Sequence, residues 1–402
     1  MRGCGFLFHN RGAVCNWTLP LADLAKTFNS DSTFSHRSSD RRRKQMEKPK
    51  PRITKKTVIL PVVGILAFFL YIYIFNVDLI SILKTAQQAE PLPYIAAILV
   101  SFVEILFFAI SWRELLVGLD IKLSLLKSYA FVCYGIFLDI LVPAESLSGE
   151  IGRVYLVNRE QSGTSGRVVA SLVTFRLLSM ALNTFFLLFG AALLFSVTTI
   201  DPVIFKVIQF LAIGTAIILV AAIVVVRREA WSAKIINGVI RATRFVSRGK
   251  WGGDNLREEA NKAVKIFHVS MKDMMHNPAK LVIPTAFLAL SWISGMAIPY
   301  LVFISLGYRV SWGIILVTTS IVVAIKSIPV GIPFEVGLPE IAMTTVYAAL
   351  GVPAEIAATS TILSRIITLW LRFGVGFTSY QLTELKAAQN SNNVQLLQKE
   401  TP

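Results

Sequence analysis

The stretch VIFKVIQFLAIGTAIILVAAIVVV, residues Val203–Val226, decides the fold class because it carries a single charge, that of Lys206. About 20 consecutive apolar residues are enough for a helix to cross the hydrocarbon core of a bilayer. Inside lipid the backbone amides must bond to one another, and an α-helix achieves this within one segment. The stretch therefore predicts a transmembrane helix.

The whole chain has the composition of a membrane protein. Of its 402 residues, 54% are apolar and only 16% are charged, whereas soluble domains carry about 25% charged residues. The other long apolar runs are Val58–Phe75, Tyr94–Leu116, Val168–Val197, Leu281–Leu306 and Ala354–Tyr380. Together with Val203–Val226 they predict an all-α polytopic membrane protein with six full spans.

The formal net charge of +16 would suggest a nucleic-acid partner in a soluble protein. Here the basic residues gather in polar segments between the apolar runs, a pattern that orients membrane proteins and attracts anionic lipids. We therefore expect no nucleic-acid binding. We expect the protein in the plasma membrane, with both termini in the cytoplasm.

The polar segments also divide the chain. Residues 1–56 predict a disordered basic N-terminal tail, in which Met46 is an alternative start, and residues 383–402 predict a polar C-terminal tail. Residues 57–382 form the predicted transmembrane domain. Within it, residues 227–280 hold twelve Lys or Arg against five Asp or Glu, with apolar residues at helical spacing. Both an amphipathic helix on the cytoplasmic face and an ordinary solvated linker fit this segment.

Two apolar segments, Tyr129–Tyr155 and Trp312–Tyr347, are interrupted by proline and glycine, which break helices. If basic residues mark the cytoplasmic side, an even number of crossings separates the N-terminus from residues 227–280. That number is even only if Tyr129–Tyr155 enters and leaves on one side, as a re-entrant helical hairpin. The same argument predicts a hairpin in the second segment. The expected hairpin-breaking residues are Pro143, Gly149, Gly152, Pro329, Gly331 and Gly337.

The two halves of the chain resemble each other. Leu119–Ser124 matches Leu306–Ser311 at an offset of 187 residues, and Gly149-Glu150 resembles Phe334-Glu335 at an offset of 185. Each half reads as a span, a hairpin and a span. Because the charge pattern gives the halves opposite orientations, we predict inverted repeats, a design common among transporters.

Charged residues lie deep in these segments, where each costs about 2.5–3.5 kcal/mol on insertion scales. We expect them to face one another or a wet cavity. A helix that starts after a break offers free amides to an anion, and an arginine adds a bidentate contact, so a lipid phosphate is a suitable guest. The candidate residues for a lipid-headgroup cavity are Asp139, Glu150, Arg153, Arg176, Lys326, Glu335, Glu340 and Arg365.

Ion pairing inside the protein is the competing interpretation of these charges. It joins Arg176 to Glu150, and Arg365 to Glu340 or Glu335. Asp139 and Lys326 either pair with each other across the repeat or each take a local partner. For Glu104 the alternatives are a proton-coupling carboxylate and an interior polar contact.

Catalytic and metal-binding patterns are missing from the sequence. The three cysteines and four histidines are scattered, and no nucleophile–base set or phosphate-binding glycine loop is present. We therefore expect no cofactor and no metal.

The residues Pro143, Gly149-Glu150 and Arg153, followed by Arg176 within the next helix, are similar to a motif of the lysylphosphatidylglycerol synthase transmembrane family. These are the flippase-like, UPF0104-type membrane proteins. The second half adds the matching residues Pro329, Gly337, Glu340, Gly351-Val352 and Arg365. One departure is Phe334-Glu335, where the family usually has a glycine pair. The resemblance covers residues 57–382.

The resemblance implies a domain that moves a modified phospholipid or glycolipid between leaflets, with membrane lipids bearing anionic or amine-containing headgroups as partners. Arg153, Arg176 and Arg365 would bind phosphate, while Glu150 and Glu340 would bind a cationic group or hold the hairpins. One alternative is a glycosyl or headgroup transferase in lipid-linked sugar assembly, with Glu150 as base or metal ligand. Another is a subunit that partners a separate lipid synthase, and a homo-oligomer is compatible with each.

Overall fold

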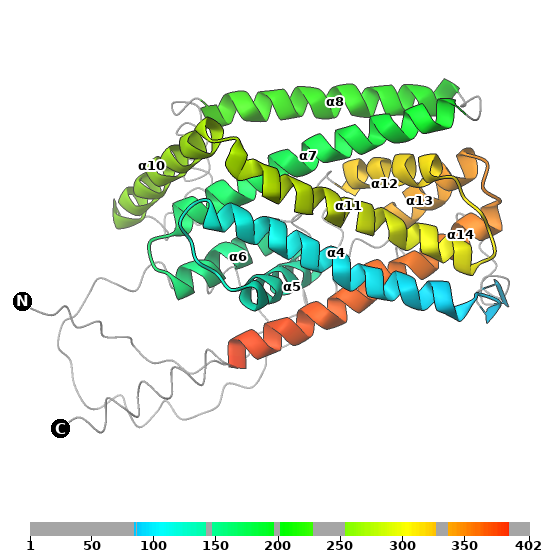
Figure 1. Cartoon of the computed structure of the whole chain (residues 1–402), viewed down its shortest axis with the longest axis horizontal. Coiled ribbons are helices and arrows are strands. Elements are labelled where there is room, and N and C mark those ends of the chain that lie inside the picture. The colour runs from blue at the N-terminus through cyan, green and yellow to red at the C-terminus, as the bar shows by residue number, and fades with distance from the viewer. Residues whose placement is uncertain are drawn as a thin grey trace, which may run out of the picture.

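The computed structural model describes residues 84–85, 87–141, 147–196, 202–227, 254–326 and 337–385, and the regular structure of these residues is helical (Figure 1). The helices are α4 (Pro91–Val117), α5 (Leu125–Leu141), α6 (Leu147–Glu160), α7 (Ser165–Phe195), α8 (Pro202–Arg227), α10 (Asp254–His276), α11 (Ala279–Ser305), α12 (Trp312–Lys326), α13 (Leu338–Ala349) and α14 (Ala354–Arg365), the last continued by the π-helix η2 (Ile366–Leu371).

Five segments of the described chain are long and apolar enough to cross a membrane. They are Pro91–Val117, Ser165–Phe195, Phe205–Val225, Ala279–Ser305 and Ala354–Leu385. They confirm five of the six predicted spans and the all-α polytopic class. The sixth, Val58–Phe75, lies outside the described residues.

The helices α4 and α11 lie side by side and antiparallel, and three hydrogen bonds fix their register. The Glu90 amide donates to the Ser305 carbonyl oxygen across 2.7 Å, and the Ser111 hydroxyl donates to the Pro284 carbonyl oxygen across 2.8 Å. Between them, Ser291 Oγ donates to the Glu104 carbonyl oxygen. This pair forms the centre of the bundle.

Two pairs of short helices, α5–α6 and α12–α13, stand where the hairpins were predicted. The two pairs lie toward opposite ends of the long helices (Figure 1). In α5–α6 the helices approach closely at Gly149, where an added Cβ would collide with the Asp139 carboxylate and the Gly135 carbonyl oxygen. At Gly152 an added Cβ would lie 2.5 Å from Leu138 Cδ1. Gly149 and Gly152 thus lie within α6 and do not break it, contrary to the prediction, and they permit close packing inside the helix pair.

The turns that lead into the two helix pairs have the same geometry. Asp120 has φ of 60° and Gly307 has φ of 70°, both in the left-handed region. The Ile121 amide donates to the Leu116 carbonyl oxygen, and Tyr308 does the same to Phe303. Each of these correspondences has the offset of 187 residues found in the sequence, so the backbone supports the predicted repeat.

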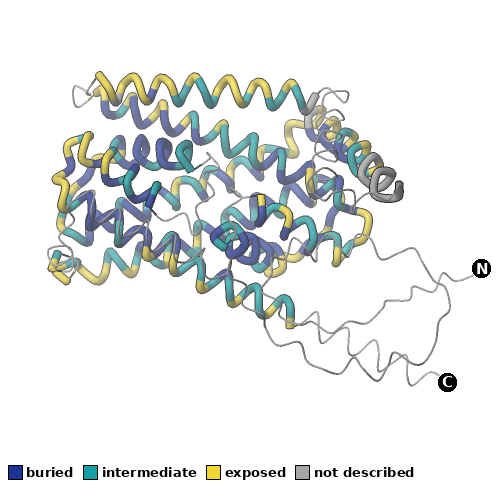
Figure 2. Tube along the Cα trace, turned by 180° about the vertical axis from the view of Figure 1, so that it is seen from behind, coloured by how far each residue is buried: buried dark blue, intermediate teal, exposed yellow. Residues whose placement is uncertain are grey.

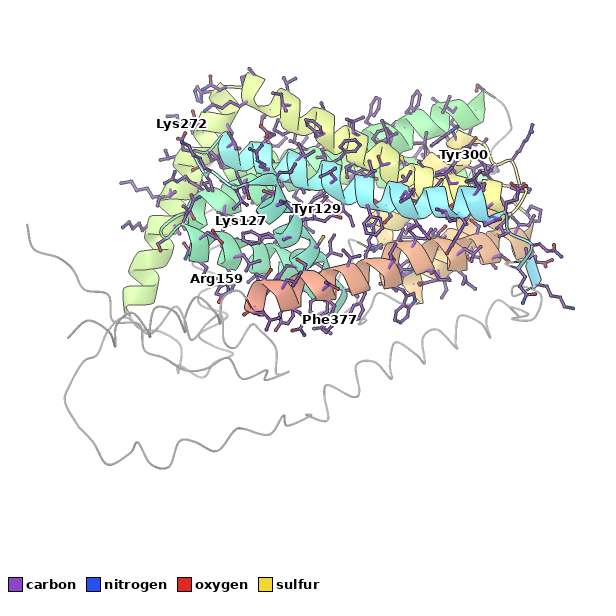
Figure 3. The ribbon with its side chains drawn as sticks, turned by 60° about the horizontal axis from the view of Figure 1, so that its bottom comes forward. Lys127, Tyr129, Arg159, Lys272, Tyr300 and Phe377 are labelled. Atoms are coloured by element: carbon purple, nitrogen blue, oxygen red, sulfur yellow. The ribbon has the colours of Figure 1, made fainter. Side chains whose placement is uncertain are left out.

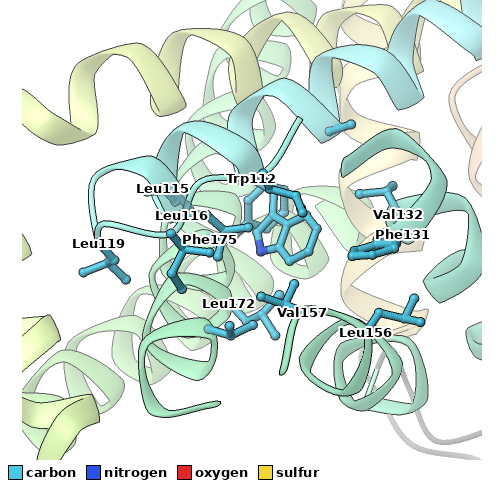
Figure 4. Packing of buried hydrophobic residues seen from close by; sticks show 14 of the residues in the cluster. Trp112, Leu115, Leu116, Leu119, Phe131, Val132, Leu156, Val157, Leu172 and Phe175 are labelled. Atoms are coloured by element: carbon cyan, nitrogen blue, oxygen red, sulfur yellow. The ribbon is translucent and has the colours of Figure 1, made fainter. Parts of the chain in front are cut away.

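The largest buried cluster joins α4, α5, α6 and α7 around the fully buried Trp112, whose Nε1 donates to Ser171 Oγ across 3.2 Å (Figure 4). By contrast, α8 exposes most of its apolar side chains along one edge of the molecule (Figure 2). In a membrane protein such side chains face lipid. The core is therefore concentrated around the α5–α6 pair and its neighbours.

The helix α10 buries Phe267, Met271 and Met274. It lies directly on α7, because a Cβ at Gly166 would be 2.5 Å from the Ala263 carbonyl oxygen. Of the two interpretations of residues 227–280, the described part fits an amphipathic helix, and its apolar face packs on the protein itself.

Basic side chains mark one end of the bundle. Lys127, Arg159 and Lys272 all lie at the end at which α10 is placed, and Tyr300 lies toward the other end (Figure 3). By the positive-inside rule we expect the end with α10 to face the cytoplasm. The α5–α6 pair enters the bundle from this end.

Candidate functional site

Asp139, near the end of α5, holds the start of α6. Its Oδ1 accepts hydrogen bonds from Ser148 Oγ at 2.9 Å and from the Gly149 amide at 2.7 Å. These bonds satisfy donors that the first turn of a helix leaves free. Of the two alternatives for Asp139, the structure therefore shows a local partner rather than Lys326.

Glu150 and Arg176 form the ion pair that the sequence suggested. Glu150 lies in the first turn of α6, and its Oε1 is 3.1 Å from Nη1 of Arg176 in α7. The two side chains keep 22% and 38% of their surface exposed. A partly exposed pair can exchange a partner for a ligand without leaving a charge in an apolar environment.

Arg153 lies about one turn after Glu150 in α6 and is buried. Its guanidinium carbon is 5.5 Å from the ring centroids of both Phe108 and Trp112, so the arginine makes cation–π contacts with α4. Its Nη1 is buried and has no hydrogen-bond partner among the described residues. The group thus keeps a donor available beside an exposed ion pair.

The second half contains a corresponding ion pair that is buried and is called closed below. Glu340, in the first turn of α13, accepts from Arg365 Nε at 2.5 Å through Oε1 and from the Gly337 amide at 2.7 Å through Oε2. The two side chains expose only 4% and 9% of their surface. Thr344 and Thr361 continue the contact with a hydrogen bond of 3.2 Å.

Glu340 therefore corresponds to Glu150, because both begin the second helix of a pair and both bind an arginine of the next long helix. The sequence comparison aligned Glu150 with Glu335 instead. Glu335 itself, like Pro143, Pro329 and Gly331, lies outside the described residues.

A third ion pair joins the two halves. Arg372, directly after η2, donates through Nη2 to Glu104 Oε2 of α4, and the positive charge of Lys326 acts on the same carboxylate. Of the two alternatives for Glu104, the structure shows the interior polar contact.

Comparison with known proteins agrees with this architecture. The family model described as "Lysylphosphatidylglycerol synthase TM region" matches residues 58–376. The chain belongs to this family. The match includes the α5–α6 pair, the α12–α13 pair and all three ion pairs.

Three relatives of this chain are archaeal proteins named "UPF0104 membrane protein". The protein of Pyrococcus horikoshii is 24% identical over 79% of this chain and 94% of its own length. The protein of Methanocaldococcus jannaschii is 24% identical over 82% of this chain and 95% of its own length. The protein of Methanothermobacter thermautotrophicus is 25% identical over 80% of this chain and 94% of its own length. The similarity therefore extends over nearly the whole of each relative.

The structure brings six of the eight predicted site residues together, in two places rather than one, whereas Lys326 acts on Glu104 and Glu335 lies outside the described residues. Asp139, Glu150, Arg153 and Arg176 meet around α6, whereas Glu340 and Arg365 meet at α13. Sequence reasoning missed the aromatic contacts of Arg153. The signal was the spacing of four residues between Phe108 and Trp112, which places both rings on one face of α4.

Proposed function

We propose that this protein translocates the headgroup of a modified phospholipid or glycolipid across the bilayer. The observation that carries the proposal is the partly exposed Glu150–Arg176 pair beside the buried Arg153. A headgroup within a membrane needs polar partners, because water is absent there. This group offers cationic donors for a phosphate and a carboxylate for an amine.

The chemistry of the exchange is simple. A phosphate that approaches Arg176 replaces the Glu150 carboxylate as its partner, and Glu150 then accepts a hydrogen bond from an amine or a sugar hydroxyl of the headgroup. Arg153 supplies a further donor through Nη1. With an amine-bearing headgroup each charge changes one ionic partner for another, and with a sugar headgroup Glu150 keeps a hydrogen bond in place of its ion pair.

The difference between the two halves suggests how the headgroup crosses. The pair Glu150–Arg176 is partly open, and its counterpart Glu340–Arg365 is closed. In transporters built from inverted repeats, access changes sides when one repeat rocks or gates against the other. In the opposite state, Glu340–Arg365 opens at the far end of the bundle and Glu150–Arg176 closes.

Reconstitution into vesicles with a fluorescent phospholipid tests this proposal. We expect the full chain to move the lipid between leaflets, and we expect Arg176→Ala and Glu150→Gln to lower the rate at least about tenfold, which corresponds to about 1.4 kcal/mol. Arg309→Ala, which removes an exposed charge between α11 and α12, is the matched control and should leave the rate unchanged. Formation of a new lipid product without net movement would favour a transferase and contradict the proposal.

A further inference from the structure

The Glu104–Arg372 pair lies where the two halves of the protein converge. Glu104 occupies the middle of α4, and a Cβ at Gly295 of α11 would be 3.3 Å from its carboxylate. The charge of Arg372 also acts on Tyr129 and Cys133 of α5. The pair is therefore flanked by α5 from one helix pair, and Lys326 approaches it from α12 of the other.

Arg372 is only partly satisfied by Glu104. A guanidinium has five N–H donors, and the Nε of Arg372 is buried without a hydrogen-bond partner in the described part of the chain. The two side chains each keep 18% of their surface exposed. The Glu104–Arg372 pair is thus less buried than Glu340–Arg365, and Arg372 has a donor that makes no hydrogen bond within the described residues.

The backbone before Arg372 is unusual. The helix that begins at Ala354 changes from α to π geometry over Ile366–Leu371 and returns to α at Arg372. π-Helical turns are rare, and they occur frequently at functional sites. This turn places an irregular stretch of backbone next to the central arginine.

We infer that Arg372 is a second anion-binding site, at the centre of the bundle, where a phosphoryl group displaces Glu104 and binds the guanidinium. Such an exchange keeps Arg372 paired throughout, and Glu104 retains the nearby charge of Lys326 after it is displaced. The group bound is a phosphate monoanion, and the inference rests on the proposed function for its assignment to a lipid headgroup in transit.

Equilibrium binding to the detergent-purified full chain tests the site. Arg176→Ala is used as the background, so that the outer pair does not contribute. The probes are dihexanoyl phosphatidylglycerol and, separately, inorganic phosphate. Adding Glu104→Gln should tighten binding of the lipid about tenfold, because the competing carboxylate is gone. Adding Arg372→Gln should then abolish the gain, whereas Arg309→Gln, with the same charge change on an exposed turn, should not.

Equal tightening for inorganic phosphate would support an anion site for the phosphoryl group itself, and tightening for the lipid alone would assign the lipid as its source. Binding that is unaffected by Glu104→Gln or by Arg372→Gln would overturn the inference. If Arg372→Gln does not fold, Arg372→Lys retains the charge without the planar donor set and should still weaken binding. Arg372-dependent binding without lipid movement in vesicles would contradict the proposed function and leave this site standing.

Discussion

The hydroxyl of Ser291 donates a hydrogen bond of 3.1 Å to the main-chain carbonyl oxygen of Glu104, and the two residues are 187 positions apart. That separation is also the offset between the matching turns at Asp120 and Gly307. Ser291 and Glu104 therefore occupy equivalent places in the two halves. Equivalent places meet only on the axis that relates the halves, so this hydrogen bond marks the pseudo-twofold axis of the molecule.

The register of α4 and α11 agrees with such an axis. Glu90 meets Ser305, Glu104 meets Ser291, and Ser111 meets Pro284. The residue numbers of each pair add up to 395, as a constant antiparallel register requires. The Glu104–Arg372 ion pair therefore lies beside this axis.

The two related ion pairs should differ in what they contribute to stability. Arg365→Ala leaves the buried Glu340 carboxylate without its partner, and breaking a buried pair costs about 3–5 kcal/mol. Glu150→Gln affects a partly exposed pair, for which we expect about 1 kcal/mol or less. Thermal unfolding of the purified variants measures both. Equal losses of stability would refute the distinction between a closed and an open pair.

Glycine at position 149 should be indispensable to the α5–α6 pair. Gly149→Ala would drive a methyl group into the Gly135 carbonyl oxygen, which cannot move without the helix. We expect a loss of stability of about 1–3 kcal/mol from this overpacking. Gly152→Ala meets only side-chain atoms, Leu138 Cδ1 at 2.5 Å and the Tyr134 ring at 3.2 Å, and Gly214→Ala on α8 meets nothing within 4 Å. The order of melting temperatures should be Gly214→Ala, Gly152→Ala, Gly149→Ala, from highest to lowest.

The two helix pairs should open to opposite sides of the membrane. In a background in which Cys4, Cys15 and Cys133 are replaced, a membrane-impermeant maleimide should label Ser162→Cys from the side of α10. It should label Ala349→Cys from the other side only. Both positions are exposed in the structure. Labelling of both from one side would eliminate the inverted arrangement.

The contact between α10 and α11 should respond to acid. The hydrogen bond of 2.9 Å from Lys280 Nζ lowers the pKa of Asp273 below its ordinary value, which is about 3.9. A lowered pKa in the folded state means that the stabilisation is present above the ordinary value and is lost as the pH falls through the folded value. The melting temperatures of the wild type and of Asp273→Asn should therefore differ at pH 7 and converge as the pH falls below about 3.9. Lys280→Met should show the same convergence, and a difference that stays constant as the pH falls below the ordinary pKa of aspartate would exclude this cause.

Sequence reasoning succeeded where a single physical requirement decides the outcome. Uninterrupted apolar runs gave five of the helices, such as α8, to within a few residues. The pairing of Arg176 with Glu150 followed because a lone cation in an apolar helix needs a counter-ion. The match between Leu119–Ser124 and Leu306–Ser311 is visible in the sequence because both segments form the same kind of turn.

Other features depend on three-dimensional proximity, which the sequence does not contain. The partner of Asp139 is the start of the next helix, and only the close approach at Gly149 brings the two together. Arg372 stands among several apolar residues, and no local pattern connects it with Glu104, which is 268 positions away. The unequal exposure of the two hairpin ion pairs likewise arises from packing.

The exposed helix α8 adds little to the core, yet it determines the orientation of the second half of the chain relative to the first half. Between the start of α4 and the start of α11 the chain passes along three long helices, α4, α7 and α8. Three is odd, so α11 begins at the end of the bundle opposite to the one where α4 began. A chain that lacked α8 would pass along an even number of these helices before α11. Its second half would then have the same orientation as the first half instead of the inverted one. The contact between Ser291 and Glu104 exists because one poorly packed helix reverses the polarity of everything that follows it.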